Sequence, residues 1–471
     1  MKLTFYGAAG GNVIPSRILL GSTLLDCGDE IPKKESSNRK IDFGSLKPPE
    51  VETVLFSHSH TDHIAAIWAL VQSGFNGGIE STGPTKEIGK ALLIDNYKKD
   101  LVDAVFKLYK SPRRFLERFE IAEGIYATFY PACGHILGAS SILVEFEKEK
   151  LRVLFSGDLG NTNKNMLEVN GVVPEADIVI MESTYGYREH HPDFELSLKE
   201  LYKGINETYD KGGNFYIPVL SIHKLQEALY YQNLGIEKGQ IPDDINVMVD
   251  STLGEVVTEI YLKAHNREYF SKDAQNYFNT YSKAAPFNYT NDINEGGKNI
   301  ILASSGLDGL RGKFRKHLQD LSNDKNSIAV VSHRIEGSLL DDIALGKETI
   351  GTNGHSIELN AKSFTLSGFS SHADATQLVN WLEKTKAKYV FLVHGENDSR
   401  NMLKQMIIAK GLCPEKNIFT PAMLEAFNLT SLASAGNSCS INNVEGIEPD
   451  SSLKTKHTVF GYELNFKKPL N

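Results

Sequence analysis

The sequence contains little cysteine and no long hydrophobic run. Its four cysteines, Cys27, Cys133, Cys413 and Cys439, lie far apart among 471 residues and form no CxxC pair. This spacing disfavours a disulfide framework and a structural zinc knuckle. No apolar segment approaches the roughly 20 residues of a membrane-spanning helix, and the opening MKLTFYGAAGG lacks the layout of a signal peptide. We therefore expect a cytoplasmic protein with no membrane partner.

An excess of basic residues is also lacking. The formal net charge is −9, with 50 lysines and arginines against 59 aspartates and glutamates. An acidic chain is a poor candidate for coating nucleic acid over a broad surface. The charge remains compatible with an enzyme that grips a few phosphates, especially if its site carries metal ions. The composition, 41% hydrophobic and 23% charged, is typical of a globular protein of two or three domains.

Strand and helix patterns divide the chain into four segments. In residues 1–194, short runs rich in Val, Ile, Leu and Phe end repeatedly in polar loops, which is a strand pattern. In residues 195–354, strand and helix patterns alternate, which predicts a mostly parallel sheet. The first pattern returns in residues 355–425, so we expect one domain interrupted by an inserted one. Residues 426–471, rich in Ser and Asn, form a C-terminal extension of unknown role.

The segment SHSHTDHIAA carries four metal-ligand side chains within six positions, directly after a strand that ends at Phe56. Alternate residues of an extended chain point the same way, so His58 and His60 can bind one metal ion. Asp62 and His63 lie where a helix begins and can face a second ion. Imidazole nitrogen and carboxylate oxygen suit zinc. Histidines on loops often bind nothing, but four potential ligand side chains at this spacing predict a metal site.

Three further candidates also follow apolar strands. His135 lies in CGHILGAS, Asp158 in FSGDLG and His394 in FLVHGEN. Taken singly, each is more often a structural residue than a catalytic one. With the first cluster, they complete seven ligands: three histidines for one ion, an aspartate and two histidines for the other, and one bridging aspartate. That number suits a two-metal site, with ions roughly 3.5–4 Å apart and a hydroxide between them.

The motif HxHxDH at residues 58–63, followed by GHILGAS and SGD, resembles the metallo-β-lactamase superfamily of hydrolases. MESTYG at 181–186, SGFSSHAD at 367–374 and LVHGE at 392–396 resemble the three additional motifs of its β-CASP family. That family contains RNA-processing nucleases related to the cleavage-and-polyadenylation endonuclease. The resemblance extends to about residue 420. It implies an α/β fold: a metallo-β-lactamase αββα sandwich interrupted by an inserted Rossmann-like β-CASP domain.

The resemblance also implies a role for each site residue. The first zinc ion would be bound by His58, His60 and His135, the second by Asp62, His63 and His394, with Asp158 bridging the two. Asp26 would orient a ligand histidine, and Glu182 would keep His372 oriented and readily protonated. The expected catalytic residues are therefore Asp62, Asp158, Glu182 and His372. A buried structural pair is the alternative for Glu182 and His372, and manganese or iron stays open in place of zinc.

The histidine at position 394 bears on the substrate. In the β-CASP family, RNA-cleaving branches carry histidine here and the DNA-repair branch generally carries an apolar residue, so LVHGE implies RNA. The expected function is a zinc-dependent ribonuclease that hydrolyses phosphodiester bonds in single-stranded RNA by a two-metal hydroxide mechanism. Endonuclease and 5′-exonuclease action both stay open, as does a homodimer. The alternatives are a hydrolase of another ester or small molecule, a non-catalytic RNA-binding subunit, and a DNA nuclease, which His394 disfavours.

Four serines are candidate phosphate contacts, although ordinary turn chemistry explains them at least as well: Ser304, Ser305, Ser370 and Ser371. The sequence also departs from the family in the inserted domain. His223 and Lys224 stand where family members usually show Gly-Arg. This change leaves the predicted metal site intact and bears on how the protein would grip RNA.

Overall fold

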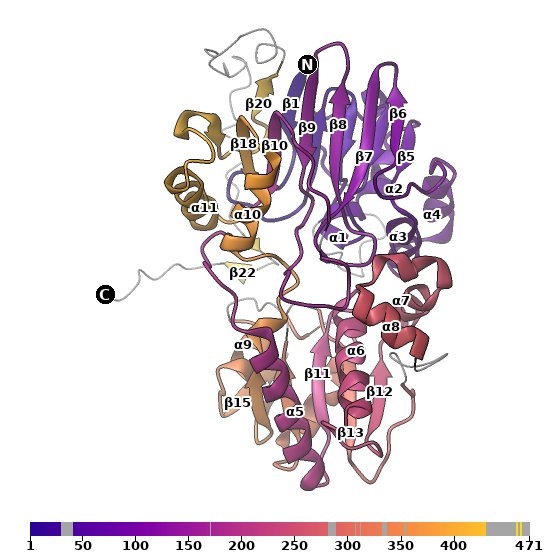
Figure 1. The fold of residues 1–471 in the computed structure, drawn as a ribbon. Coiled ribbons are helices and arrows are strands. Elements are labelled where there is room, and N and C mark those ends of the chain that lie inside the picture. Colours follow the sequence, from indigo (N-terminus) through magenta and orange to yellow (C-terminus); the bar gives the residue numbers. More distant parts are fainter. Residues whose placement is uncertain are drawn as a thin grey trace.

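The computed structural model describes most of the chain in two parts, which lie one above the other in Figure 1. The described residues are 1–29, 41–169, 171–280, 289–306, 308–310, 312–331, 337–352 and 355–429, together with the short strands β21 (Thr458–Val459) and β22 (Tyr462–Glu463). Within these residues, no helix is long and apolar enough to cross a membrane. Most of the expected C-terminal extension lies outside them.

Two sheets pack face to face in the upper part of Figure 1. The first contains, in spatial order, β20 (Ala426–Asn428), β1 (Lys2–Phe5), β2 (Ile18–Leu20), β3 (Thr23–Leu25), β4 (Thr53–Leu55) and β5 (Gly78–Glu80). The second contains β19 (Ile418–Phe419), β18 (Tyr389–Val393), β10 (Ile178–Glu182), β9 (Leu151–Phe155), β8 (Ser140–Phe146), β7 (Ile125–Pro131) and β6 (Arg118–Ala122). Apolar side chains of both sheets fill the space between them, including Phe5, Ile142, Ile180 and Phe391.

Helices cover the outer faces of this pair of sheets. The elements beside the first sheet are η1 (Pro48–Glu50), α1 (Thr61–Ile64), α2 (Ile67–Gln72), α3 (Gly83–Asn96) and α4 (Lys99–Phe106). Those beside the second are α10 (Ala375–Thr385), α11 (Asn397–Ala409) and η5 (Glu415–Asn417). A strand between a helix layer and another sheet is buried on both faces, and β10 is accordingly apolar at nearly every position. The expected αββα sandwich is confirmed.

A third sheet forms the lower part of Figure 1, and its strands all run parallel. Its spatial order is β12 (Asn246–Asp250), β13 (Asn299–Ser304), β11 (Phe215–Val219), β14 (Ser327–Val330) and β17 (Lys362–Thr365). Its helices are α5 (Phe194–Asp210), α6 (Lys224–Glu237), α7 (Thr252–Leu262), η2 (Ala264–Tyr269), α8 (Lys272–Thr280), η3 (Phe314–Ser322) and α9 (Leu339–Ala344), with a small ribbon of β15 (Thr349–Thr352) and β16 (His355–Glu358). The inserted α/β domain predicted from alternating strand and helix patterns is therefore present.

Two elements lie on the other side of the boundaries expected from the sequence. Strand β17 falls within residues 355–425, which we expected to resume the first domain, yet it pairs with β14 in the third sheet. Strand β20 falls within the expected extension 426–471, yet it pairs with β1 at the edge of the first sheet. Both strands are too short for their own periodicity to identify the sheet they join. Only the long-range pairing of their backbones decides it.

Candidate metal centre

The predicted site residues follow strands whose carboxyl ends meet at one edge of the sandwich, facing the third sheet (Figure 1). Strands β9, β10 and β18 are parallel neighbours, and Asp158, Glu182 and His394 lie at or just after their ends. In the first sheet, β3 and β4 are also parallel, and Asp26 and His58 follow them. Because parallel neighbours deliver their carboxyl ends to the same edge, residues far apart in sequence converge there.

The first donor set consists of three histidines and Asp158. His60 Nδ1 lies 3.1 Å from His58 Nε2 and 3.1 Å from His135 Nε2. Asp158 Oδ2 lies 3.6 Å from each of those two Nε2 atoms. Nitrogens this close, with a carboxylate oxygen beside them, surround a space in which one cation fits.

The second donor set uses the same oxygen of Asp158. His63 Nε2 lies 3.2 Å from His394 Nε2 and 3.5 Å from Asp62 Oδ2. His394 Nε2 lies 3.3 Å from Asp62 Oδ2. Asp158 Oδ2 is 3.3 Å from His63 Nε2, so it faces both sets. All seven ligands expected from the sequence are thus brought together.

Neighbouring groups orient two of the ligand histidines. Asp26 Oδ2 accepts from His63 Nδ1 at 2.7 Å, which leaves the lone pair of His63 on Nε2. The hydroxyl of Ser57 donates to the same carboxylate at 2.8 Å, so its oxygen can accept from His58 Nδ1 at 3.0 Å. One buried carboxylate therefore sets the tautomer of a histidine in each donor set.

Two more histidines of the donor sets, His135 and His394, are oriented in the same way. His135 Nδ1 lies 3.2 Å from the carbonyl oxygen of Ser371, which can only accept a hydrogen bond. Thr184 donates its hydroxyl to the His394 carbonyl at 3.1 Å, so its oxygen accepts from His394 Nδ1 at 3.2 Å. Each imidazole then presents its Nε2 lone pair to the centre. Sequence reasoning missed Ser57 and Thr184, although both lie inside motifs that it used, SHSH and MESTYG.

The electrostatics of the centre also suit a cation. Burial holds the pKa of His58 and His135 well below its usual value, which keeps these imidazoles neutral and able to bind metal. Burial opposes a charge on His63, but Asp158 and Asp62 outweigh it and raise the pKa of His63. Asp158 Oδ1 is buried and has no hydrogen-bond partner among the described residues. A carboxylate in this state calls for a bound positive charge, so the donor set fits metal ions.

His372 and Glu182 lie beside the two donor sets. Both carboxylate oxygens of Glu182 are 3.3 Å from His372 Nδ1, and Glu182 also accepts from the backbone N–H of Leu159 at 2.6 Å. His372 Nε2 points toward the centre, 3.9 Å from Asp158 Oδ2. The side chain of His372 is 22% exposed, whereas that of Glu182 is 1% exposed. Glu182 thus holds the imidazole through Nδ1, and Nε2 on the opposite side of the ring faces the centre.

The four candidate phosphate serines occupy two different places. Ser370 and Ser371 immediately precede His372, and the carbonyl of Ser371 orients His135. Ser304 ends β13 in the third sheet and Ser305 follows it, and their hydroxyls make local hydrogen bonds there. Ser304 accepts from the N–H of Lys313 at 3.1 Å, and Ser305 donates to the Gly306 carbonyl at 2.8 Å. Only the first pair lies next to the metal centre.

Comparison with known proteins agrees with this geometry. Residues 21–202 match the family described as "Metallo-beta-lactamase superfamily", and residues 356–421 match "Zn-dependent metallo-hydrolase RNA specificity domain". Ribonuclease TTHA0252 of Thermus thermophilus is 28% identical over 87% of this chain and 97% of its own length. Transcription termination factor FttA of a Lokiarchaeum is 30% identical over 77% of this chain. Cleavage and polyadenylation specificity factor subunit 3-I of Arabidopsis thaliana is 28% identical over 87%.

The chain spans 61% of the length of each of the last two relatives. A crystal structure of a protein of unknown function from Enterococcus faecalis has a TM-score of 0.52 and 12% identity, covering 90% of this chain and 99% of that one, and it shows the fold alone. The sandwich and the paired donor sets define a metal-dependent hydrolase. The chain belongs to the β-CASP family of RNA-processing nucleases within the metallo-β-lactamase superfamily.

Proposed function

We propose that this protein is a cytoplasmic, zinc-dependent ribonuclease that hydrolyses phosphodiester bonds of single-stranded RNA at a two-metal centre. The observation that carries the proposal is the pair of donor sets that share Asp158 Oδ2. The matched RNA specificity domain, residues 356–421, and the names of the relatives support RNA as the substrate. A ligand set of histidine and carboxylate suits zinc, and manganese and iron share this preference in part.

The proposed zinc ligands are His58, His60 and His135 for one ion and Asp62, His63 and His394 for the other, with Asp158 shared. Two bound zinc ions would supply Lewis acidity, which lowers the pKa of water and neutralises charge on phosphoryl oxygens. The protein contributes the geometry: Asp26, Ser57, Thr184 and the Ser371 carbonyl fix the ring orientations before any substrate arrives. Preorganised donors of this kind need no rearrangement during the reaction.

His372 is the proposed proton donor. Burial opposes a charge on its ring, but the Glu182 carboxylate outweighs burial and raises the pKa of His372 above its usual value. A protonated Nε2 pointing at the centre can donate to the leaving oxygen of the phosphodiester or to a phosphoryl oxygen. Glu182 keeps the ring in place through Nδ1 and balances its charge. The buried structural pair is a weaker reading, because His372 is the partly exposed member.

The proposed phosphate contacts form two groups. Ser370 and Ser371 lie in the turn before His372 and can meet the phosphate next to the scissile bond. Ser304 and Ser305 lie at the carboxyl end of β13, at the edge of a parallel sheet where open α/β sheets usually bind ligands. We infer that the second pair contacts a more distant nucleotide.

Metal analysis and RNA cleavage by the same preparation test the proposal. We expect about two zinc ions per chain and cleavage of single-stranded RNA, and products from RNA labelled at either end distinguish internal cleavage from 5′-exonuclease action. Asp158→Ala should abolish cleavage and retain the fold. Asp103→Ala, on the exposed side of α4, is the matched control and should behave as the wild type. Full activity of Asp158→Ala would contradict the shared ligand.

The alternatives give different results in the same assays. A small-molecule hydrolase would cleave a thioester or lactone and leave RNA intact. A non-catalytic subunit would bind RNA without cleaving it, even when loaded with metal. If the protein is a DNA nuclease, single-stranded DNA should compete with a labelled substrate more strongly than single-stranded RNA does.

A further inference from the structure

A buried ion-pair network joins the third sheet's domain to the sandwich near the metal centre. Glu227, on α6, is 2% exposed, and its carboxylate accepts from the ammonium groups of Lys164 and Lys224 at 2.5 and 2.9 Å. The two lysines are 5% and 7% exposed. Apolar residues of similar volume often pack as stably as buried ions. Two ammonium groups buried against one carboxylate therefore call for a functional explanation.

Each lysine connects Glu227 to one of two segments, the one that follows Asp158 and the one that precedes His372. Lys164 lies six residues after Asp158 in the chain. Lys224 begins α6, and its ammonium also donates to the carbonyl oxygen of Phe369, in the turn that leads to His372. Glu227 therefore binds the first segment through Lys164, and it pairs with the Lys224 ammonium that holds the second segment on the same helix.

Near the metal centre, the same two segments are hydrogen-bonded to each other. Gly160 and His372 form an antiparallel bridge. The N–H of Ala373 donates to the Leu159 carbonyl at 2.8 Å, and the N–H of Asn161 donates to the Ser371 carbonyl at 3.2 Å. These backbone hydrogen bonds connect the segment that Lys164 holds to His372. A displacement of that segment at Lys164 would therefore also displace the imidazole of His372.

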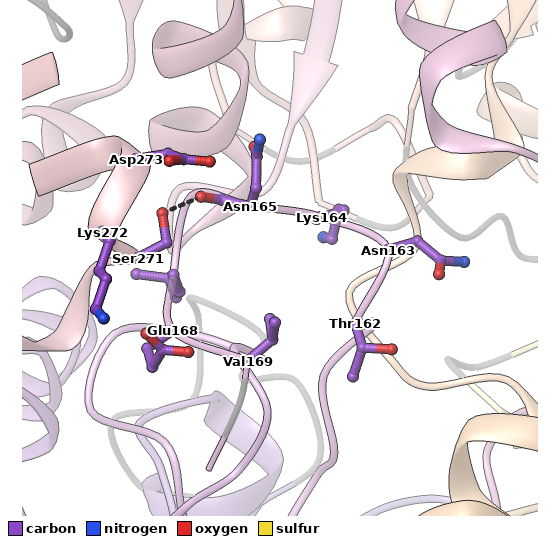
Figure 2. A pocket seen from close by; sticks show the side chains of 10 residues that line it. Thr162, Asn163, Lys164, Asn165, Glu168, Val169, Ser271, Lys272 and Asp273 are labelled. Carbon is purple, nitrogen blue, oxygen red and sulfur yellow. Dashed lines mark hydrogen bonds between the residues drawn. The ribbon is translucent and has the colours of Figure 1, made fainter. Parts of the chain in front are cut away.

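Figure 2 shows the segment after Asp158 beside residues of the inserted domain. From Thr162 to Val169 it curves around a pocket of about 540 Å³, which Ser271, Lys272 and Asp273 of the inserted domain line on the other side. Beyond Lys164, the segment is held by Asn165, which hydrogen-bonds to the Tyr231 hydroxyl on α6 and accepts from Ser271. Contacts to the inserted domain therefore decide where this segment lies.

We propose that Glu227 is a positioning residue for the cleavage reaction, fixing His372 over Asp158 through Lys164 and Lys224. The inference rests on the proposed ribonuclease function. His223 Nε2 lies 3.6 Å from the same carboxylate and is itself buried. The pair His223–Lys224, which stands where the family usually shows Gly-Arg, thus takes part in the network. We therefore infer that His223 and Lys224 help to position His372 and do not contact RNA directly.

The charges of the network support this role. Burial opposes ionisation of Glu227, but Lys164 and Lys224 outweigh it and hold the pKa of Glu227 well below its usual range. Burial lowers the pKa of Lys164 to about 7, against the attraction of Glu227. Glu227 is thus a carboxylate facing two lysines, and a neutral amide of the same shape would remove the negative charge that keeps a proton on Lys164 and pairs with Lys224.

The test is Glu227→Gln, assayed for zinc content and for kcat and KM with RNA. We expect kcat to fall about 10- to 100-fold, because a displacement near 1 Å costs this much, with KM and zinc content little changed. Glu87→Gln is the matched control. Glu87, on α3, also pairs with the inserted domain, accepting from Lys263 at 2.9 Å and His265 at 3.1 Å. Its loss should leave kcat unchanged.

A double-mutant cycle separates positioning from general stability. In a His372→Ala background, Glu227→Gln should cause no further loss of single-turnover rate, because the group it positions is gone. Losses that multiply instead would overturn the proposal. If Glu227→Gln fails to fold, Lys164→Met keeps one ammonium against one carboxylate, and it should show the same dependence on His372. An unchanged kcat in Lys164→Met would also overturn it.

The failure of this proposal can be told from the failure of the proposed function. A zinc-loaded wild type that does not cleave RNA contradicts the ribonuclease function and this inference together. An active wild type whose Glu227→Gln variant keeps its kcat contradicts the positioning role alone.

Discussion

Asp26→Asn should weaken zinc binding at both positions of the centre, although Asp26 is not itself a ligand. Its carboxylate accepts from the Ser57 N–H, the Ser57 hydroxyl and His63 Nδ1, all within 2.8 Å. The backbone of Asp26 has φ 57°, a region that asparagine tolerates, so the substitution keeps the backbone. With the amide oxygen retained opposite the Ser57 N–H, the NH₂ group faces His63 Nδ1.

Two donors then face each other, and His63 must shift its proton to Nε2, the atom that points at the metal. Loss of a group that orients a metal-binding histidine typically costs 10- to 100-fold in metal affinity. A lost hydrogen bond to a charged acceptor costs about 2 kcal/mol. The two figures agree on roughly a 30-fold loss. Because Ser57 also loses its acceptor, His58 of the first donor set is affected as well.

Competition with a chelator of known zinc affinity measures the effect, and circular dichroism checks the fold. RNA cleavage by the variant should require a higher free zinc concentration and recover at saturating zinc. Asp103→Asn, on the surface of α4, is the control. If Asp26→Asn binds both zinc ions as tightly as the wild type, the tautomer argument is refuted.

Three further predictions follow from single contacts. Thr184→Val removes the hydroxyl that orients His394. At limiting zinc, the metal content of this variant should fall from about two ions per chain toward one. An unchanged zinc content in metal analysis would contradict this role of Thr184. Gly28→Ala places a Cβ 1.5 Å from the Asp62 carbonyl oxygen, and this overpacking should lower the free energy of unfolding by about 3 kcal/mol, measured by urea denaturation; wild-type stability would show that the backbone yields easily. Burial lowers the pKa of His191 from 6.5 to about 4, so the folded state binds fewer protons between these values and its stability falls as pH falls through this window. His191→Gln should flatten that part of the stability profile, and an unchanged slope would rule out His191 as its source.

Local patterns were sufficient to predict an interrupted domain, a parallel sheet in the insert and the candidate ligands, whereas the αββα sandwich followed from the resemblance of the motifs to a known family. The four potential ligand side chains of residues 58–63 lie within one loop and the start of α1. Because they are close in sequence, they are also close in space. The parallel sheet followed from regular alternation of strand and helix patterns, which backbone hydrogen bonding enforces locally. The polar residue that recurs after each apolar strand indicated which positions were candidates for the functional site.

The tertiary structure alone decided how distant residues pair. His63 and His394 are 331 positions apart, and their approach depends on two strands from different sheets ending at one edge. The tautomers set by Asp26 and Thr184, the sheet that β17 joins, and the pairing of Glu227 with Lys164 have no local signature. Each depends on contacts between segments that are remote in the chain, and such contacts form only when the whole fold buries its apolar surface.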